Sequence, residues 1–203
     1  MEAALGPFMS LVFNGKSGPF TDPRVRAATG FAIRREEIVQ SAFFGRGAPL
    51  QGMPLQPGTP FFDEKLSQHY SYDPERAKKL LADAGVPNGF SCTLLSTAQY
   101  GMYKSTAEVV QQHLAEIGIQ AMLSLPDWPT RISLANKGQY EFAIIGNTME
   151  GTDPDALGYL IDGELSIAPA RSYGIPTPKI HELLAAGRAE FDMEKRKSIY
   201  EQV

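Results

Sequence analysis

Residues 90–125, FSCTLLSTAQYGMYKSTAEVVQQHLAEIGIQAMLSL, decide the class of the fold. Apolar residues alternate with smaller or polar ones over 90–94, which predicts a half-buried strand. From 102 to 117 apolar residues recur at the spacing of one helix face, and Gly118 ends the pattern. Alternation returns over 119–125. The order strand, helix, strand predicts a parallel βαβ unit and therefore an α/β fold.

Helix starts flank this unit on both sides, because a capping side chain repeatedly precedes a proline that suits the first helical position. A mostly apolar run over 140–146 predicts a strand that is buried on both faces. A further helix is expected from Glu36 to Phe44, and another from Met193 onward. The starts are Asp22-Pro23, Asp73-Pro74, Trp128-Pro129, Asp153-Pro154 and Thr177-Pro178.

A long loop is expected over 45–60, where four glycines and four prolines interrupt any helix or central strand. Loops of about 15 residues are uncommon unless they have a function or lack order. A surface connector and a functional loop are both open for this segment.

Composition places the chain among ordinary globular domains. It has 203 residues, 43% of them hydrophobic and 21% charged, which fits one domain with its own core. A net charge of −4 gives no electrostatic footprint for nucleic acid. No apolar run approaches the roughly 18 residues that cross a bilayer. Nucleic acid is therefore not an expected partner.

Motifs for catalysis and metals are incomplete. His181–Ala185 begins like a zinc-protease helix but lacks the second histidine. Gly45–Leu50 lacks the third glycine of a dinucleotide loop, and Asp153–Gly158 puts a leucine where a calcium loop needs oxygen, which leaves calcium a weak alternative. His113 lies on an apolar helix face and Cys92 inside a strand, so both are interpreted as core residues. We predict no catalytic residue, no metal ligand and no cofactor.

Acidic residues leave one alternative to binding. Asp153 and Asp155 could supply paired carboxylates for acid–base chemistry, but a helix cap explains their spacing better. The cap leaves Glu150 unexplained. Glu150 lies in a loop after a buried strand, where open α/β sheets place ligands.

Six stretches together resemble the C-terminal lobe of bacterial extracellular solute-binding proteins of family 5, the peptide and nickel class that feeds ABC importers. Residues 72–85, YDPERAKKLLADAG, are the most specific of them. The resemblance implies a periplasmic-binding-protein-like (type II) α/β lobe, with a mixed β-sheet flanked by helices. The other stretches are residues 19–39, 114–119, 137–143, 153–155 and 191–200.

The resemblance also implies a domain organisation. Residues 1–203 would form a single lobe, with a strand over 11–14 near the hinge. The N-terminal lobe, signal peptide and C-terminal return segment would lie outside this chain, as the mid-pattern ending at Val203 also suggests. Such a lobe is expected to bind solute weakly on its own.

Four residues after the predicted strand take positions that bind ligand in peptide-binding relatives. Asn147 stands where those relatives have tryptophan, and Thr148 and Met149 follow. Glu150 takes the place of an aspartate that captures the peptide amino terminus. We therefore expect Glu150 to contact a cationic part of the ligand.

The family also lines its cleft with residues between Ser96 and Tyr103. Here Thr97, Gln99 and Tyr100 offer hydrogen bonds and an aromatic face. The arginine that dipeptide binders place there for the carboxyl end is missing. The resemblance therefore favours a longer peptide or a non-peptide solute over a dipeptide.

The function that the resemblance implies is capture of a peptide or similar small solute between two lobes, for delivery to an ABC permease. The protein is expected to be a monomer, periplasmic or anchored at the cell surface as a lipoprotein. A solute sensor or chaperone-like protein of the same fold is the alternative, and a carboxylate-dependent enzyme is less favoured.

Overall fold

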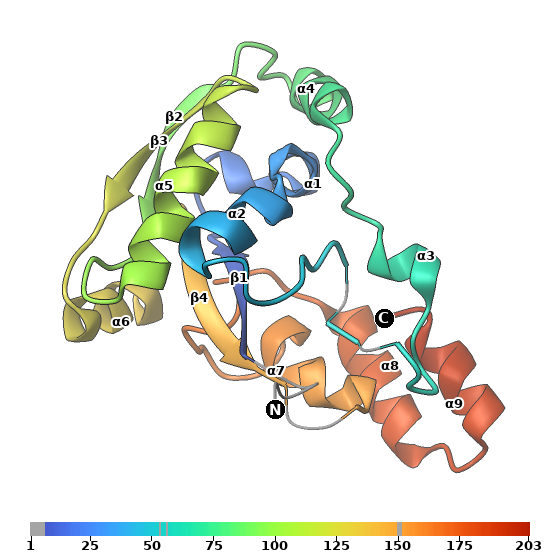
Figure 1. Ribbon diagram of the computed structural model, residues 1–203. Helices are drawn as coiled ribbons and strands as arrows, with labels where there is room; N and C mark the ends of the chain where they lie inside the picture. The colour runs from blue at the N-terminus through green and yellow to red at the C-terminus, as the bar shows by residue number, and fades with distance from the viewer. Residues whose placement is uncertain (1–6, 53, 56, 150–151) are drawn as a thin grey trace.

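The computed structural model describes residues 7–52, 54–55, 57–149 and 152–203 (Figure 1). Its centre is the predicted βαβ unit, formed by β2 (Phe90–Leu95), α5 (Gly101–Ala115) and β3 (Ile119–Ser124). β2 and β3 are parallel, with Phe90 opposite Ile119 and Leu95 opposite Ser124. The sequence prediction is confirmed for all three elements.

Two further strands complete a mixed four-stranded sheet in the order β1-β4-β2-β3. β4 (Phe142–Thr148) is parallel to β2, whereas β1 (Pro7–Phe13) is antiparallel to β4 along its whole length. The three parallel strands therefore end at one edge of the sheet, the lower edge in Figure 1.

The strand expected over 140–146 is shifted by two residues. β4 continues through Asn147 and Thr148 because β1 pairs with it as far as Pro7 opposite Thr148. The strand predicted over 11–14 begins earlier and ends one residue sooner, since β1 runs from Pro7 to Phe13. Apolar pattern alone missed both ends, where pairing with a neighbouring strand extends each strand.

Three of the predicted helix starts are capped as expected, whereas Thr177 makes no cap bond and Asp127 caps the helix that begins at Trp128. Asp22, Asp73 and Asp153 each accept a hydrogen bond from a backbone N–H in the first turn. The Asp153 helix starts as a 3₁₀ turn and only then becomes α-helical. The helical elements are η1 (Pro19–Thr21), α1 (Pro23–Ala32), α2 (Arg35–Ala42), α3 (Glu64–Ser67), α4 (Pro74–Asp83), α6 (Trp128–Asn136), η2 (Pro154–Leu157), α7 (Gly158–Ile161), α8 (Pro178–Ala189) and α9 (Met193–Tyr200).

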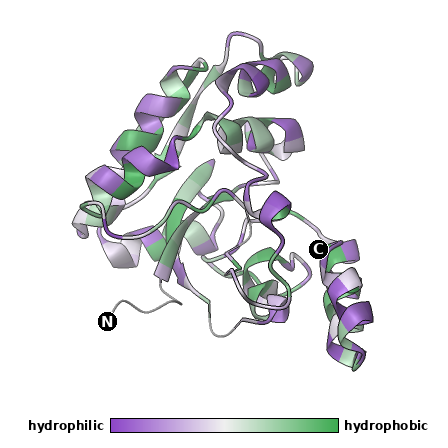
Figure 2. Cartoon of the chain, turned by 45° about the vertical axis from the view of Figure 1, so that its right-hand side comes forward, coloured by the Kyte–Doolittle hydropathy of each residue, from purple (hydrophilic) through white to green (hydrophobic). Residues whose placement is uncertain are grey.

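Two hydrophobic clusters cover the two faces of the sheet. The larger one packs α1, α4 and α5 against one face, around the fully buried Phe20 and Phe142. The smaller one packs α6 against the other face, through Ala135, Ala143 and Ile145. The strands at the centre are accordingly the most hydrophobic part of the chain in Figure 2. Helices on both faces leave the strand ends as the place for a site.

Candidate functional site

A hollow of about 1160 Å³ opens at the edge of the sheet where β4 ends. β1, the loop after α2, the start of α5, the end of β4 and the segment from η2 to α7 surround it. Its lining is mostly apolar or aromatic, with a few polar groups, as in binding sites for small molecules. The lining residues are Pro7, Phe8, Met9, Phe43, Arg46, Gly47, Met102, Tyr103, Gly146, Asn147, Thr148, Ala156 and Tyr159.

The hollow exists because β4 extends further than its parallel neighbour, β2. β2 pairs with β4 only at Leu94 and Leu95, opposite Phe142 and Ala143. Beyond Ala143, β4 keeps β1 on one side, but no described strand continues on the other. Side chains form hydrogen bonds with the backbone of that open edge instead.

Two side chains form hydrogen bonds with backbone groups of β4 that β2 does not pair. Arg131, fully buried on α6, donates from Nη2 to the carbonyl oxygen of Ile144. The N–H of Gly146 donates to the hydroxyl of Tyr103 at 2.8 Å. A Cβ atom at residue 146 would lie 2.6 Å from that hydroxyl oxygen, so a larger residue there would displace the Tyr103 hydroxyl.

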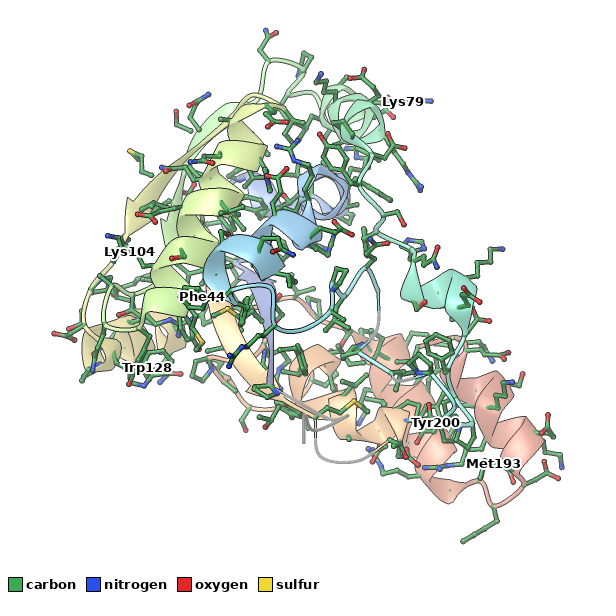
Figure 3. All side chains as sticks on the ribbon, viewed as in Figure 1. Phe44, Lys79, Lys104, Trp128, Met193 and Tyr200 are labelled. Carbon is green, nitrogen blue, oxygen red and sulfur yellow. The ribbon has the colours of Figure 1, made fainter. Side chains whose placement is uncertain are left out.

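Three aromatic rings cluster beside this edge. Tyr100, Tyr103 and Trp128 contact one another in pairs, with centroid distances of 6.0, 5.5 and 5.5 Å. Trp128, the first residue of α6, lies below the lower end of α5 in Figure 3. The guanidinium carbon of Arg131 lies 5.2 Å from the Trp128 ring centre and 6.0 Å from that of Tyr103. The buried Arg131 therefore lies against Tyr103, which also lines the hollow.

The predicted residues at the end of β4 lie in or next to the hollow. Asn147 and Thr148 line it, and Asn147 donates from Nδ2 to the Ser10 hydroxyl at 2.9 Å. The Thr148 carbonyl accepts a hydrogen bond from the Tyr159 hydroxyl. Met149 is buried directly after the strand. Glu150 lies outside the described residues.

The predicted residues after β2 lie on the α6 side of the aromatic cluster. Thr97 is fully buried, and its hydroxyl donates to the carbonyl of Pro126 at 2.7 Å and accepts from the N–H of Gln99. The Gln99 side chain accepts from the N–H of Trp128. Tyr100 keeps 43% of its surface exposed. Thr97 and Gln99 thus hold the loop, while Tyr100 is presented by it.

Sequence reasoning missed several lining residues. Arg46 and Gly47 come from the loop that was left open between a connector and a functional segment. Met102 and Tyr103 lie in the first turn of α5, the helix that follows β2, where helix starts commonly face a site. Tyr159 reaches the hollow through the fold of η2 and α7. The sequence marks the start of this helical segment at Asp153-Pro154, but not which of its side chains face the hollow.

Asp153 and Asp155, which were considered for acid–base chemistry, are engaged elsewhere. Asp153 pairs with Arg196, and Asp155 accepts from Arg188 at 2.8 Å. Asp162, which is buried, bonds to Nδ1 of His181 at 2.8 Å. Burial opposes the charged form of Asp162, but the hydrogen bonds from His181 and from the N–H of Glu164 outweigh it and lower its pKa.

The two core interpretations agree with the structure. His113 is buried and bonds through Nε2 to Glu37 at 2.9 Å, and this bond helps to lower the pKa of Glu37. Burial raises the pKa of the Cys92 thiol to about 12. A thiol with that pKa is almost wholly protonated at neutral pH and is a poor nucleophile.

Within the described residues, no three side chains of histidine, cysteine, aspartate or glutamate come together where they could hold a metal. The described helices also include none that is both long and apolar enough to cross a bilayer.

Comparison with known proteins decides the family. A sequence model of the bacterial extracellular solute-binding proteins, family 5 Middle, matches residues 3–167. The chain belongs to this family. Family 5 relatives include the dipeptide-binding protein of Escherichia coli (strain K12), 28% identical over 95% of this chain and 36% of its own length. A glutathione-binding protein of Shigella flexneri is 35% identical over 62% of this chain and 24% of its own length.

Solved structures show the same fold. The binding protein AgaA from A. tumefaciens R10, in complex with agropinic acid, is 40% identical with a TM-score of 0.90 over 97% of this chain and 40% of its own. A dipeptide-binding protein from Pseudoalteromonas sp. SM9913, in complex with Met-Leu, is 25% identical with a TM-score of 0.79 over 97% of this chain and 39% of its own. The periplasmic-binding-protein-like α/β class is confirmed. The chain thus spans well under half the length of these relatives, which are named for what they bind.

Proposed function

We propose that residues 1–203 form the ligand-binding lobe of a solute-binding protein, which captures a peptide or similar small solute and delivers it to an ABC permease. The observation that carries this proposal is the hollow at the carboxyl edge of the sheet, lined by apolar groups and by Asn147 and Thr148. Related binding proteins share the fold over almost the whole chain. A second lobe would close over the hollow and exclude water, which strengthens polar contacts.

The predicted site residues divide by role in this proposal. Asn147, Thr148 and Tyr100 contact the solute, because the first two line the hollow and Tyr100 is exposed beside it. Thr97 and Gln99 position the loop that carries Tyr100. Met149 and Glu150 complete the site, with Glu150 facing a cationic part of the solute.

The cellular setting follows from the family. The family is extracellular, and we propose a periplasmic or surface-anchored protein that is a monomer in solution. The partner would be a permease in the cytoplasmic membrane, which receives the solute when the lobes open. An enzyme is not proposed, since the relatives named above bind their ligands.

The test is to block the hollow in the full-length protein. Thr148→Trp adds a bulky ring to an exposed lining position, whereas Met122→Trp adds the same ring on the edge strand β3, where Met122 is 61% exposed. Native mass spectrometry and calorimetry identify the bound solute and its affinity. Thr148→Trp should weaken binding by about tenfold or more, as expected when one substitution removes about 1.4 kcal/mol.

The Met122→Trp control should bind as the parent protein does. Equal binding by both variants, or no small solute bound by the parent protein, would contradict the proposal. Glu150→Gln tests the separate expectation for Glu150: unchanged affinity for a solute with an ammonium group would remove Glu150 from the site.

A further inference from the structure

The described part of the lining of the hollow carries a positive charge. Among its described lining residues, Arg46 is the one that carries a formal charge, and no aspartate or glutamate accompanies it. Arg46 is exposed in the loop that follows α2. An exposed guanidinium at the rim of a mostly apolar hollow suits a ligand with a planar anionic group, because its parallel N–H groups match a carboxylate.

A second cation lies beneath the floor of the hollow. Arg131 is fully buried, yet its described contacts are one backbone carbonyl and two aromatic rings. Its Nε and Nη1 atoms have no hydrogen-bond partner in the part of the chain that the structure describes. Burial lowers the pKa of Arg131, but a guanidinium stays protonated at physiological pH.

Other buried charged groups are treated differently. Asp162 has His181 and two further donors or charges nearby, and Arg171 donates to the carbonyls of Tyr159 and Ser166. Among the described residues, buried side-chain atoms without a partner are confined to Arg131 and to Nδ1 of His113. An unneutralised buried cation costs several kcal/mol, and such costs concentrate at functional sites.

The position of Arg131 connects that cost to the hollow. Tyr103 forms part of the lining, and its ring centre lies 6.0 Å from the Arg131 guanidinium. In a region of low dielectric constant the charge is poorly screened over such a distance. Arg131 therefore places positive charge next to a lining residue, and Arg46 places it in the lining itself.

We propose that this hollow selects solutes that carry a carboxylate, with Arg46 contacting the carboxylate and Arg131 acting from beneath Tyr103 as a positioning charge. This inference rests on the proposed function, because it names the class of solute for the same site. A cationic solute without a carboxylate would meet two arginines and be rejected.

The experiment uses the full-length protein and two steps. Native mass spectrometry first identifies any co-purified solute. Calorimetry then measures agropinic acid, Met-Leu and glutathione, each beside the derivative in which its carboxylates are amides, with glucose and putrescine as neutral and cationic probes. The tightest acid should bind about tenfold or more better than its amide, the ratio expected for a charge-assisted hydrogen bond.

The variants separate the two arginines from a general structural effect. Arg46→Gln should reduce the acid-to-amide ratio to about threefold or less while the amide binds as before, since the bond to the charged group is lost. Arg131→Met should reduce the ratio as well, and Arg131→Lys should retain part of it because the charge stays. Lys79→Gln removes a cation from α4, far from Trp128 in Figure 3, and should change nothing.

Each outcome decides between the two proposals. A ratio near one in the parent protein, an unchanged ratio in Arg46→Gln, or tight binding of glucose or putrescine alone would overturn the carboxylate inference and leave solute binding intact. The absence of any co-purified solute, together with no binding across the whole set of probes, would overturn the proposed function itself.

Discussion

The two halves of β4 have different kinds of support. At Phe142 and Ala143 the strand lies between β1 and β2, so backbone hydrogen bonds and apolar packing act on both sides. From Ile144 to Thr148, β1 continues alone, and Arg131 and Tyr103 serve the other edge. The first half is therefore stabilised by many repeated contacts, and the second by a few individual side chains.

This difference indicates how a fold can bind different solutes. A side chain that completes an open strand edge can be replaced one at a time, without removing a strand from the sheet. The paired half holds the lobe together and tolerates little change. Variation at the open half changes the lining and the charge of the hollow while the sheet stays intact.

The strongest test of the paired half is Phe142→Ala. Phe142 is fully buried and packs against the rings of Phe13 and Phe20, whose centroids lie 6.4 and 5.0 Å from its own. Its truncation leaves a cavity in the larger cluster and should lower the free energy of unfolding by about 3–5 kcal/mol. Urea denaturation of the full-length protein measures the change.

Phe191→Ala is the matched control, since Phe191 is 97% exposed and its loss should matter by no more than about 0.5 kcal/mol. Equal effects of the two truncations would mean that the paired half is not the rigid part of this lobe.

The open half should respond to a single hydroxyl. Tyr103→Phe leaves the ring in place but removes the acceptor for the N–H of Gly146. A backbone donor left without a partner in a half-buried place should cost about 1–3 kcal/mol. The same denaturation series measures it, with Tyr100→Phe as a control whose hydroxyl belongs to a half-exposed ring. A loss no larger than in the control would show that water replaces the Tyr103 hydroxyl.

The Asp162–His181 pair shows what a partnered buried charge does with pH. The folded-state pKa of Asp162 lies below its ordinary value. Its stabilising contribution is therefore present above the ordinary aspartate pKa of about 3.9 and is lost as the pH falls through the lowered folded-state pKa. The free energy of unfolding, measured between neutral pH and pH 3, should fall less steeply with falling pH in Asp162→Asn than in the parent protein. The exposed Asp83→Asn should follow the parent curve, and so would Asp162→Asn if the pair contributed nothing.

The elements around the paired half of β4 could be predicted from the sequence, because their signals are local. Alternation gave β2 and β3, and aspartate–proline pairs gave the starts of α1 and α4. The ends of β1 and β4 could not be predicted in this way. They depend on which strand pairs with which, and Asn147 and Thr148 carry no apolar pattern.

The candidate site was predictable only in part, for the same reason. Asn147 and Thr148 follow from their place after a buried strand, together with the family resemblance. In the sequence Arg131 is one polar position on a short predicted helix, and no local pattern indicates that the fold buries it. Arg46 lies in a loop whose path depends on tertiary contacts. Charges that meet at a site from separate elements require the three-dimensional structure.

Arg131, which supports the open half of β4, can be compared with a half-buried arginine that has partners. Arg131→Met removes a buried charge, which is favourable, and leaves the carbonyl of Ile144 without its donor, which is not. The two effects nearly cancel, so the free energy of unfolding should change by only about 1 kcal/mol in either direction. Arg196→Met is the matched change at a partnered arginine, where bonds to Asp153 and to the carbonyl of Gly187 are lost.

Arg196→Met should therefore cost about 1.5–3 kcal/mol, as hydrogen bonds between charged groups do. If Arg131→Met costs more than Arg196→Met, Arg131 is a structural residue whose charge the lobe already compensates. The excess positive charge under the hollow would then be absent, and the selection of carboxylates would depend on Arg46 alone. A near-neutral Arg131→Met with a lost preference for acids would instead show that this arginine is retained for binding rather than for folding.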